Sequence, residues 1–570
     1  MNEHVTIFFG LIGGLALFLY GMNSMSDALQ KAAGEGMKKI LSFLTRNAVM
    51  GALAGALVTA VLQSSSATTV MVIGFVSAGL MSLPQAISVI FGANIGTTMT
   101  AQLMAFKITN YIYPIIFIGF LLNFACKKEK IKNIGMVIFS FGLLFEGIEI
   151  MGGVMKPLAS SPFFVEMMGK VSHLPVLGVL LGAGMTLVVQ SSSATIAVLQ
   201  NFASQAGPDG VTSVIGLTGA IPILLGDNIG TTITALLASI GQSKNAKRTA
   251  LAHSVFNITG SIVFLFLIPV LAGFVRLISP KGPELEVISR QIANAHTTFN
   301  VVCTLIWLPL IPVMVKIVTF LVQGQDTRQR QSYEPKFLEN RVITQPTAAL
   351  YLVSEEIQRI SDFAKQMLNN MKLAFVGKEP LAAYENFKNM HFAVKKLQEQ
   401  VNNYIVKMFS SGTLTEQQSE QAAGLFYINN NINRIADRCE EISSVAALSL
   451  DQGGIFSDDA QHELENGLGT LEKLFSTAMQ ALENGDKDIV AKVSKDKNKI
   501  IKLQKQNNKA HLLRVKKNTC SSDMTLHYSN LLYNIDRIAD SCVSISEEAM
   551  DTISFQKLYQ NNAEQNKFSK

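Results

Sequence analysis

A string of four polar residues occurs twice inside long apolar sequence, and few folds can accommodate it. Gln-Ser-Ser-Ser occupies 63–66 within the apolar run 48–80, and the same four residues occupy 190–193 within the run 173–205. Hydrocarbon offers no water to an amide and a row of hydroxyls, so these groups need partners from the protein or from a ligand. The repetition predicts a membrane unit present in two copies whose polar strings meet as a pair, as in many secondary transporters.

Composition divides the chain into a membrane part and a soluble part. The 570 residues are 48% hydrophobic and only 16% charged, which is too apolar for a soluble protein of this length. Most acidic residues follow position 330, and the basic excess behind the net charge of +6 lies in loops of the apolar part, so no nucleic-acid partner is indicated. We expect a membrane domain over 1–322, a polar linker over 323–346 and a soluble domain over 347–570.

The apolar part repeats itself beyond the two polar strings. A second pair of strings, GANIGTT at 92–98 and GDNIGTT at 226–232, extends the similarity. We expect one repeat over about 5–126 and another over about 133–250, followed by two further helices that end near 320. The apolar stretches, against about 20 residues for one helical crossing, cover roughly 5–30, 48–80, 84–106, 110–126, 133–151, 173–205, 211–240, 249–275 and 294–320.

Basic clusters predict the orientation of the two repeats. Lysines and arginines gather at 31–46, 127–132 and 244–248, and such clusters normally stay in the cytoplasm. All three reach that side only if 48–80 and 173–205 do not cross. At about 33 residues each, these runs are too long for one span and short for two, which favours re-entrant hairpins with polar tips. The repeats are then inverted in a bacterial inner (plasma) membrane, and the C-terminal domain is cytoplasmic.

The C-terminal part shows the periodicity of soluble amphipathic helices. Apolar residues follow a spacing of three and four, and the string NRIAD at 433–437 returns as DRIAD at 536–540. We therefore expect an all-α protein whose tail is a duplicated bundle of two three-helix halves. The residues of the two predicted core stripes are Leu425, Ile428, Ile432, Ile435, Cys439 and Ile442, and Leu531, Ile535, Ile538, Cys542 and Ile545.

The polar strings are suited to a small anion together with a cation. Hydroxyls, amides and the backbone N–H groups of broken helix ends can bind an anion. No lysine or arginine lies within 47–106 or 171–243, so we expect a bound cation to supply the counter-charge. Hydroxyl and carbonyl oxygens suit Na⁺. The glycines of the GANIGTT and GDNIGTT strings would permit unwinding there, although small residues also allow close helix packing.

These motifs resemble the type II family of sodium-dependent phosphate cotransporters and their bacterial relatives, over about residues 5–320. The resemblance implies Na⁺-coupled transport of inorganic phosphate by alternating access, with co-transported sodium, no organic cofactor and no enzymatic activity. With the neighbouring hydroxyls and amides included, the candidate site for phosphate and sodium comprises Gln63, Ser64, Ser65, Ser66, Thr68, Asn94, Thr97, Thr98, Gln190, Ser191, Ser192, Ser193, Thr195, Asp227, Asn228, Thr231 and Thr232.

Three titratable residues near these motifs leave alternatives open. Asp227 stands where the first copy has Ala93, and it is either a Na⁺ ligand that breaks the symmetry or a helix N-cap. His253 and His296 are either ordinary packing residues or participants in coupling.

The tail resembles a PhoU-type domain, the helical regulator that accompanies phosphate uptake systems. That resemblance implies a metal held by Asp437, Asp536 and Asp540, although Asn433 replaces one expected carboxylate. The alternative is a polar edge with Arg434 and Arg537 as charge partners. A membrane-anchored phosphate-status regulator with little transport of its own is the second hypothesis for the whole chain. Expected partners are inorganic phosphate and membrane lipid, with a homodimer and a regulatory partner of the tail as further candidates.

Overall fold

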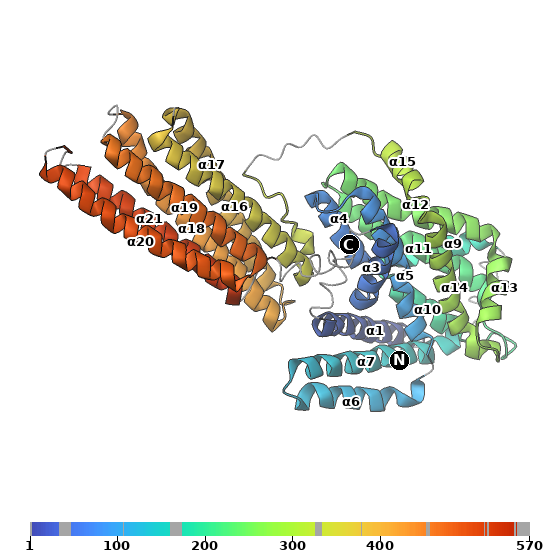
Figure 1. The fold of residues 1–570 in the computed structure, drawn as a ribbon. Coiled ribbons are helices and arrows are strands. Elements are labelled where there is room, and N and C mark those ends of the chain that lie inside the picture. The colour runs from blue at the N-terminus through green and yellow to red at the C-terminus, as the bar shows by residue number, and fades with distance from the viewer. Residues whose placement is uncertain are drawn as a thin grey trace, which may run out of the picture. The chain divides into compact units, whose positions relative to one another are not determined.

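The computed structural model of the chain is helical throughout its described residues, which form two compact units, 1–326 and 327–570 (Figure 1). The described part contains 19 α-helices and no strand, so the all-α prediction is confirmed. The structure describes residues 3–33, 47–106, 108–159, 174–324, 333–377, 379–451, 456–517, 519–520, 524–551 and 555. The predicted basic positions Lys38, Lys39 and Arg46 lie outside these ranges.

The membrane unit begins with two similar series of helices. Helices α1 and α7 pack along each other, and α6 packs against α7 (Figure 1). Each of α1 and α7 is followed by a broken pair and then by a long helix. The first series is α1 (Glu3–Ala33), α3 (Ala48–Leu62), α4 (Ser65–Ala78), α5 (Leu83–Met104), η1 (Thr109–Tyr111) and α6 (Ile112–Ala125); the second is α7 (Glu129–Ala159), α9 (Pro175–Val189), α10 (Ser192–Ala203) and α11 (Gly216–Ser239).

Four further helices complete the unit, where the sequence predicted two. The run 249–275 divides into α12 (Lys244–Phe266) and α13 (Ile268–Ile278), and the run 294–320 divides into α14 (Glu284–Trp307) and α15 (Ile311–Leu321). A proline stands at the start of both α13 and α15, where its ring ends the preceding hydrogen-bond ladder. The pair α14 and α15 bends by 88°. The expectation of two uninterrupted helices was therefore wrong.

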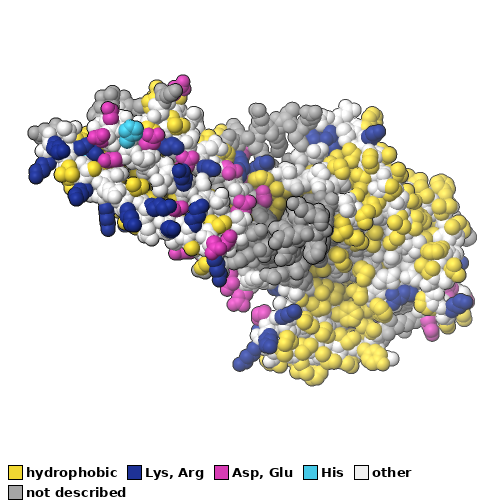
Figure 2. All heavy atoms as spheres, viewed as in Figure 1, with side chains coloured by type: hydrophobic (Ala, Val, Ile, Leu, Met, Phe, Trp, Pro, Cys, Tyr) yellow, Lys and Arg dark blue, Asp and Glu magenta, His cyan; other side chains and the backbone are white. Residues whose placement is uncertain are grey.

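The surface of this unit is apolar in the manner of a membrane protein. Four helices are long and apolar enough to cross a membrane, and the bent pair α14–α15 raises that number to five among the described residues. Figure 2 shows large areas of hydrophobic side chains on the visible face of this unit, whereas lysine, arginine and acidic side chains are scattered over the tail. Exposed Phe117, Phe124 and Phe266 belong to this apolar surface, which lipid can cover.

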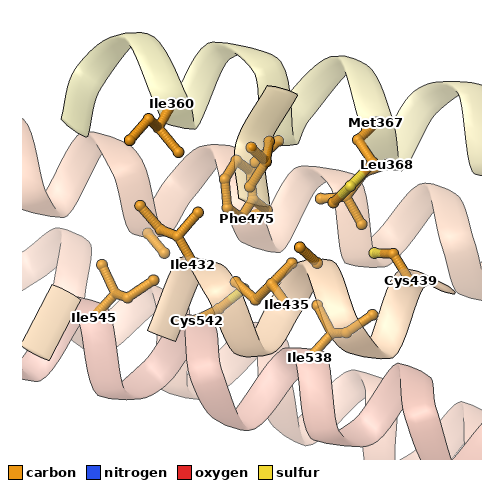
Figure 3. Packing of buried hydrophobic residues seen from close by; sticks show 14 of the residues in the cluster. Ile360, Met367, Leu368, Ile432, Ile435, Cys439, Phe475, Ile538, Cys542 and Ile545 are labelled. Atoms are coloured by element: carbon orange, nitrogen blue, oxygen red, sulfur yellow. The ribbon is translucent and has the colours of Figure 1, made fainter. Parts of the chain in front are cut away.

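The tail is a bundle of six helices in two halves of three. Its helices are α16 (Pro346–Val376), α17 (Pro380–Ser410), α18 (Glu416–Asp451), α19 (Asp458–Asn484), α20 (Lys487–Lys516) and α21 (Met524–Asp551), preceded by the short η2 (Asn340–Val342). Every residue of the two predicted core stripes is buried, and Figure 3 shows Ile432, Ile435 and Cys439 of α18 pointing toward Ile538 and Cys542 of α21. The predicted stripes are therefore confirmed.

Candidate functional site

The two Gln-Ser-Ser-Ser strings form matched breaks between helices. Gln63 follows α3 and Gln190 follows α9, and both have a left-handed backbone, with φ of 51° and 55°. They are the two non-glycine residues with positive φ in the described part of the chain. Since a side chain disfavours this conformation, two identical instances at the same motif indicate a tight reversal fixed by its surroundings.

Each break ends in a new helix whose first turn is capped by a serine of the string. Ser64 Oγ accepts a hydrogen bond from the N–H of Ala67 at 3.2 Å, and Ser191 Oγ accepts one from Ala194 at 3.3 Å. The N-termini of α4 and α10 therefore lie at the polar strings, with their free N–H groups and the positive end of the helix dipole. Such an end favours an anion without a buried lysine or arginine.

Side chains of both repeats meet at the first break. Gln63 is 8% exposed, and its Oε1 accepts a hydrogen bond from Thr100 Oγ1 of α5 at 2.8 Å. Ser66 lies 3.0 Å from Thr234 Oγ1, which comes from α11 of the second repeat. The first serine string thus lies against the second copy of the unit, as the pairing of the strings requires.

A bonded pair of threonines occurs at the equivalent place in each repeat, but only the pair of the second repeat also contacts Asp227. Thr59 bonds Thr68 at 2.8 Å, and Thr186 bonds Thr195 at 3.0 Å. Thr186 also lies 2.6 Å from Asp227 Oδ1, and Asp227 Oδ2 is buried without a partner. Asp227 lies in the middle of α11, so the N-cap alternative was wrong.

The glycines of the GANIGTT and GDNIGTT strings serve close packing and not unwinding. Both α5 and α11 run unbroken through these strings. A methyl group on Gly92 would lie 1.7 Å from the carbonyl oxygen of Ala52 in α3, and one on Gly226 would lie 2.0 Å from that of Val179 in α9. Backbones therefore touch at both crossings, and the expected unwinding was wrong. The hydroxyls of Thr97, Thr98, Thr231 and Thr232 bond carbonyl oxygens of their own helices.

A third duplicated motif, which the sequence reasoning missed, holds the asparagines of these strings. Ala-His-x-x-Phe-Asn occurs at 252–257 in α12 and at 295–300 in α14. His253 Nε2 lies 2.9 Å from Asn94 Oδ1, and His296 Nε2 lies 3.3 Å from Asn228 Oδ1. The 43-residue offset between the two strings was the available signal. The histidines therefore belong to the site region and are not isolated packing residues.

Several buried polar atoms of this region lack a partner. Among the described residues they are Thr69 Oγ1, Asn94 Nδ2, Asp227 Oδ2, His253 Nδ1, Asn257 Oδ1, His296 Nδ1 and Asn300 Oδ1. Because an unpaired buried polar atom is costly, these atoms are the ones from which a ligand of the site would gain most. The structure thus places Ser66 against α11, Asp227 against Thr186 and the two asparagines against His253 and His296, while the side chain of Gln190 is exposed.

Two of the three candidate metal ligands in the tail form ion pairs with lysines. Asp437 Oδ1 lies 2.6 Å from Lys395 Nζ, and in the second half Asp540 pairs with Lys497 and Arg537. Of the expected charge partners, Arg537 is confirmed, whereas Lys395 and Lys497 were missed. Burial, and then the charge of Asp540, raises the pKa of Asp536 above its ordinary value.

The described residues bring one group of three potential metal ligands together, and it differs from the expected set. His391, Asp437 and Glu440 offer ligand atoms within 4.8 Å of one another. Asp437 is the member shared with the expected trio, and Asp536 and Asp540 do not join this group. Carboxylate and imidazole ligands of this kind fit a divalent metal, although Lys395 occupies Asp437 in this structure.

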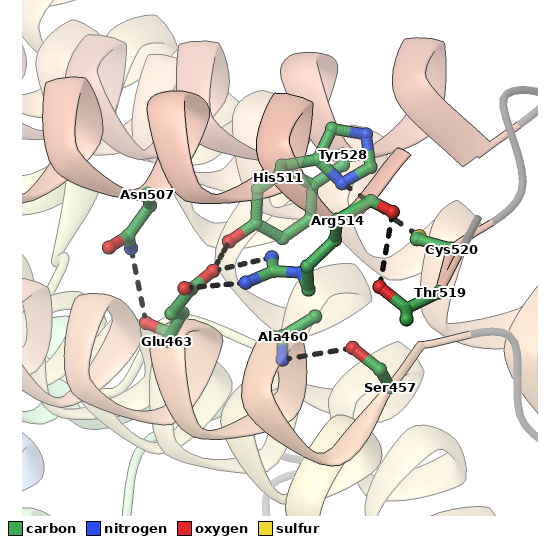
Figure 4. A network of polar contacts seen from close by, with 9 residues as sticks. All are labelled: Ser457, Ala460, Glu463, Asn507, His511, Arg514, Thr519, Cys520 and Tyr528. Carbon is green, nitrogen blue, oxygen red and sulfur yellow. Dashed lines mark hydrogen bonds and ion pairs between the residues drawn. The ribbon is translucent and has the colours of Figure 1, made fainter. Parts of the chain in front are cut away.

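The second half of the tail contains a nearly buried ion pair. Arg514 forms two bonds of 2.8 Å to the carboxylate of Glu463, and Tyr528 also donates to that carboxylate at 2.5 Å (Figure 4). Burial alone would raise the pKa of Glu463, but the bonds from Arg514 and Tyr528 outweigh it and lower the pKa. This network joins α19, α20 and α21.

Comparison with known proteins places both units in established families. The Na+/Pi-cotransporter family model matches residues 17–153 and 155–293, and the PhoU domain model matches residues 357–446 and 468–549. No solved structure matches the chain.

Curated relatives cover either the membrane unit or the whole chain. "Uncharacterized protein YqeW" of Bacillus subtilis is 34% identical over 266 residues, which is 47% of this chain and 84% of the relative. "Putative inorganic phosphate export protein YjbB" of Escherichia coli strain K12 is 24% identical over 543 residues, or 95% of this chain and 97% of the relative. "Sodium-dependent phosphate transport protein 2A" of Rattus norvegicus is 37% identical over 97 residues, 17% of this chain and 15% of the relative. With its matched helical breaks and duplicated tail, the chain belongs to the Na+/Pi-cotransporter family of membrane transporters and carries a PhoU domain.

Proposed function

We propose that this protein transports inorganic phosphate coupled to Na⁺, with phosphate and sodium bound between the two helical breaks. The observation that carries the proposal is the matched pair of left-handed glutamines, Gln63 and Gln190, each followed by a serine-capped helix N-terminus. Two helix N-termini can offer phosphate oxygens many N–H donors at once. The family and the relatives named for phosphate transport support phosphate as the anion.

Sodium supplies the positive charge that residues 47–106 and 171–243, around the two breaks, lack. The described polar interior offers oxygen atoms without partners, among them Asp227 Oδ2 and Asn257 Oδ1. Carboxylate and amide oxygens are hard ligands, and a bound Na⁺ would offset the cost of burying both the carboxylate and phosphate. Asp227 has no counterpart at Ala93, so the two repeats bind sodium unequally.

The PhoU domain acts as the regulator of transport from the cytoplasmic side. Its duplicated helices present Asp437 and Asp540 at equivalent positions, each bound to a lysine in this structure. A divalent metal that displaced Lys395 from Asp437 would change the charge on one face of α17 and α18, and such a change can serve as a regulatory signal. Metal content of the purified chain, compared with that of Asp437→Asn, tests this part.

Flux measurements test the transport proposal directly. Proteoliposomes containing the full chain are expected to take up ³²P-phosphate when an inward Na⁺ gradient is imposed, and not when choline replaces Na⁺. Gln63→Ala and Gln190→Ala should each reduce the flux at least tenfold, because both breaks contribute to one site. Gln242→Ala is the control, since Gln242 bonds Ser77 outside the breaks and should leave flux close to wild type.

The competing regulator hypothesis predicts a different result. A phosphate-status regulator would show no Na⁺-dependent flux in wild-type proteoliposomes, and its starvation phenotype in cells would survive Gln63→Ala and Gln190→Ala. Efflux from loaded proteoliposomes under an outward Na⁺ gradient, measured beside uptake, reports the preferred direction. Absence of flux in both directions would contradict the proposal.

A further inference from the structure

A groove of about 640 Å³ lies in the tail between α16, α19 and α20. Among the described residues, every side chain that lines it is polar or charged, and none is aromatic or aliphatic. Its size is within the range of small-ligand sites, about 300–1,000 Å³. Both halves of the tail contribute to it, since α16 belongs to the first half and α19 and α20 to the second. We call this space the three-helix groove.

Four lysines from three helices line the three-helix groove. They are Lys365 and Lys372 of α16, Lys473 of α19 and Lys492 of α20. Lys365 and Lys372 lie on one face of α16, because they are about two turns, or about 10 Å, apart along its axis. A lysine-rich surface of one helix would be ordinary solvated charge. Here lysines of separate helices converge on one groove.

Three of these lysines have ammonium groups without a partner among the described residues. Lys372 pairs with Glu472 at 2.8 Å, whereas Lys365, Lys473 and Lys492 form no side-chain hydrogen bond or ion pair there. All three are exposed, so their side chains can turn toward a ligand. Their ammonium groups are therefore available to an anion.

Carboxylates of the groove cancel only part of this positive charge. Glu472 is held by Lys372, and Asp496 lies 2.6 Å from Lys499, which does not line the groove. Glu465 is the third lining carboxylate, and it has no lysine or arginine partner among the described residues. Three unpaired ammonium groups against one remaining carboxylate leave the groove with a net charge of +2.

Several lysines around a polar groove suit an anion made of linked phosphate groups. An ammonium is a compact charge that binds phosphate without the planar geometry of arginine, and each phosphate of a chain can meet a different lysine. The described wall has no aromatic side chain to stack on a nucleobase. It also has no apolar side chains to receive the anchor residue of an acidic peptide. The wall therefore favours a bare phosphate chain over a nucleotide or a peptide.

We propose that the three-helix groove binds inorganic polyphosphate, with Lys365, Lys473 and Lys492 as the residues that meet its charges. The groove is a different site from the group of potential metal ligands, which lies on α17 and α18. The proposed function gives the tail a regulatory role but no anion, so this site goes beyond it. Binding of the phosphate chain does not depend on transport by the membrane unit.

Calorimetric titration of the purified full chain with tripolyphosphate tests this site. Excess inorganic phosphate is present to occupy the proposed transport site, and divalent metals are removed to keep the potential metal ligands empty. Tripolyphosphate should bind about fivefold more tightly than pyrophosphate, because a longer chain reaches one more lysine. ATP has the same number of phosphates and should bind no more tightly than tripolyphosphate, because the described wall offers nothing to its base.

Lysine variants locate the binding. Lys473→Gln and Lys492→Gln should each weaken tripolyphosphate binding about fivefold, since each removes one charge from the groove. Lys505→Gln is the matched control, because it removes the same charge from an exposed position of α20 outside the groove. Lys505 is about 20 Å along the helix from Lys492, beyond the reach of an unscreened charge, so affinity should hardly change.

Glu465→Gln keeps the test decisive, because a folding defect cannot strengthen binding. It removes the remaining unpaired carboxylate and should tighten tripolyphosphate binding about threefold. The proposal is overturned if tripolyphosphate does not bind, if Lys505→Gln weakens binding as much as Lys473→Gln, or if Glu465→Gln does not strengthen it. Tighter binding of ATP or of hexaglutamate would also overturn it, in favour of a nucleotide or an acidic peptide. A chain that binds tripolyphosphate here but shows no Na⁺-dependent flux would contradict the proposed function alone.

Discussion

At the scale of single residues, the clearest departure from symmetry is Asp227, which takes the place of Ala93. Its carboxylate is buried, and among the described residues only Thr186 bonds it through a side chain. We predict that Asp227→Asn raises the Na⁺ concentration for half-maximal phosphate flux by about tenfold, since a neutral amide oxygen binds a cation less strongly. Phosphate KM at saturating Na⁺ should change much less. The measurement is a Na⁺ activation curve in proteoliposomes.

Thr186→Val is the matched control for that experiment. It removes the hydroxyl that bonds Asp227 and leaves the carboxylate in place, so sodium binding should weaken less than in Asp227→Asn. An unchanged activation curve in Asp227→Asn, with normal folding, would show that this carboxylate does not bind sodium.

The Arg514–Glu463 pair is a residue-scale feature of the tail with consequences for stability. The two side chains are 11% and 21% exposed, so solvent screens their attraction weakly. We predict that Arg514→Gln destabilises the packing of α19, α20 and α21 by roughly 2 kcal/mol, seen as about thirtyfold faster amide exchange in these helices. Arg438→Gln is the control, since its pair with Glu441 is 36% and 53% exposed and should contribute little.

The pH dependence of this pair follows from the lowered pKa of Glu463. Its contribution to stability is complete above the ordinary glutamate pKa of 4.5 and is lost as the pH falls through the lower value of the folded protein. The exchange rates of the wild type and Glu463→Gln should therefore converge below that pH. Rates that differ equally at neutral and at strongly acidic pH would argue against the pair as the source.

At the scale of helices, close backbone crossings determine how each broken pair lies against its long helix. A methyl group on Gly226 would lie 2.0 Å from the carbonyl oxygen of Val179, and backbone cannot move aside as a side chain can. We predict that Gly226→Ala separates α9 from α11 and lowers the melting temperature of the purified chain, at a cost of about 3 kcal/mol or more. Gly184→Ala on α9 is the control.

A methyl group on Gly184 would meet no atom within 4 Å, and alanine favours a helix by about 1 kcal/mol over glycine. Gly184→Ala should therefore melt at or slightly above the wild-type temperature. Equal melting temperatures for the two variants would mean that the α9–α11 crossing is looser than its geometry indicates.

The helices also show which breaks and contacts could be predicted from sequence patterns. The breaks after α3 and α9 were predictable, because each apolar run had the wrong length for its number of crossings and a polar string in its middle. Pro269 and Pro312 could have predicted the breaks before α13 and α15, because proline ends a helical hydrogen-bond ladder. The two apolar runs were instead interpreted as single helices from their length alone. The contact between His253 and Asn94 could not be predicted, since periodicity does not determine which helices pack together.

At the scale of the whole molecule, we predict that the two similar series of helices have opposite orientations across the membrane. Basic residues of the 127–132 loop and of 244–248 favour the cytoplasm, whereas the loop between α10 and α11, around Asp209, has no lysine or arginine. Inverted hairpins place that loop on the opposite side. From the same parity we predict that the PhoU domain is cytoplasmic.

Cysteine labelling in intact cells tests this arrangement. A membrane-impermeant maleimide should label Asp209→Cys from outside, because Asp209 is exposed and its carboxylate accepts hydrogen bonds from the nearby N–H groups of Val211 and Thr212. Lys128→Cys and the tail position Glu465→Cys, both exposed, should react only after the membrane is opened. All three would be made in a chain whose five native cysteines are replaced, with ³²P-phosphate flux as the check on folding. Labelling of positions 128 and 209 from the same side would rule out inverted hairpins, and a single alternating site between the two serine strings would then need another geometry.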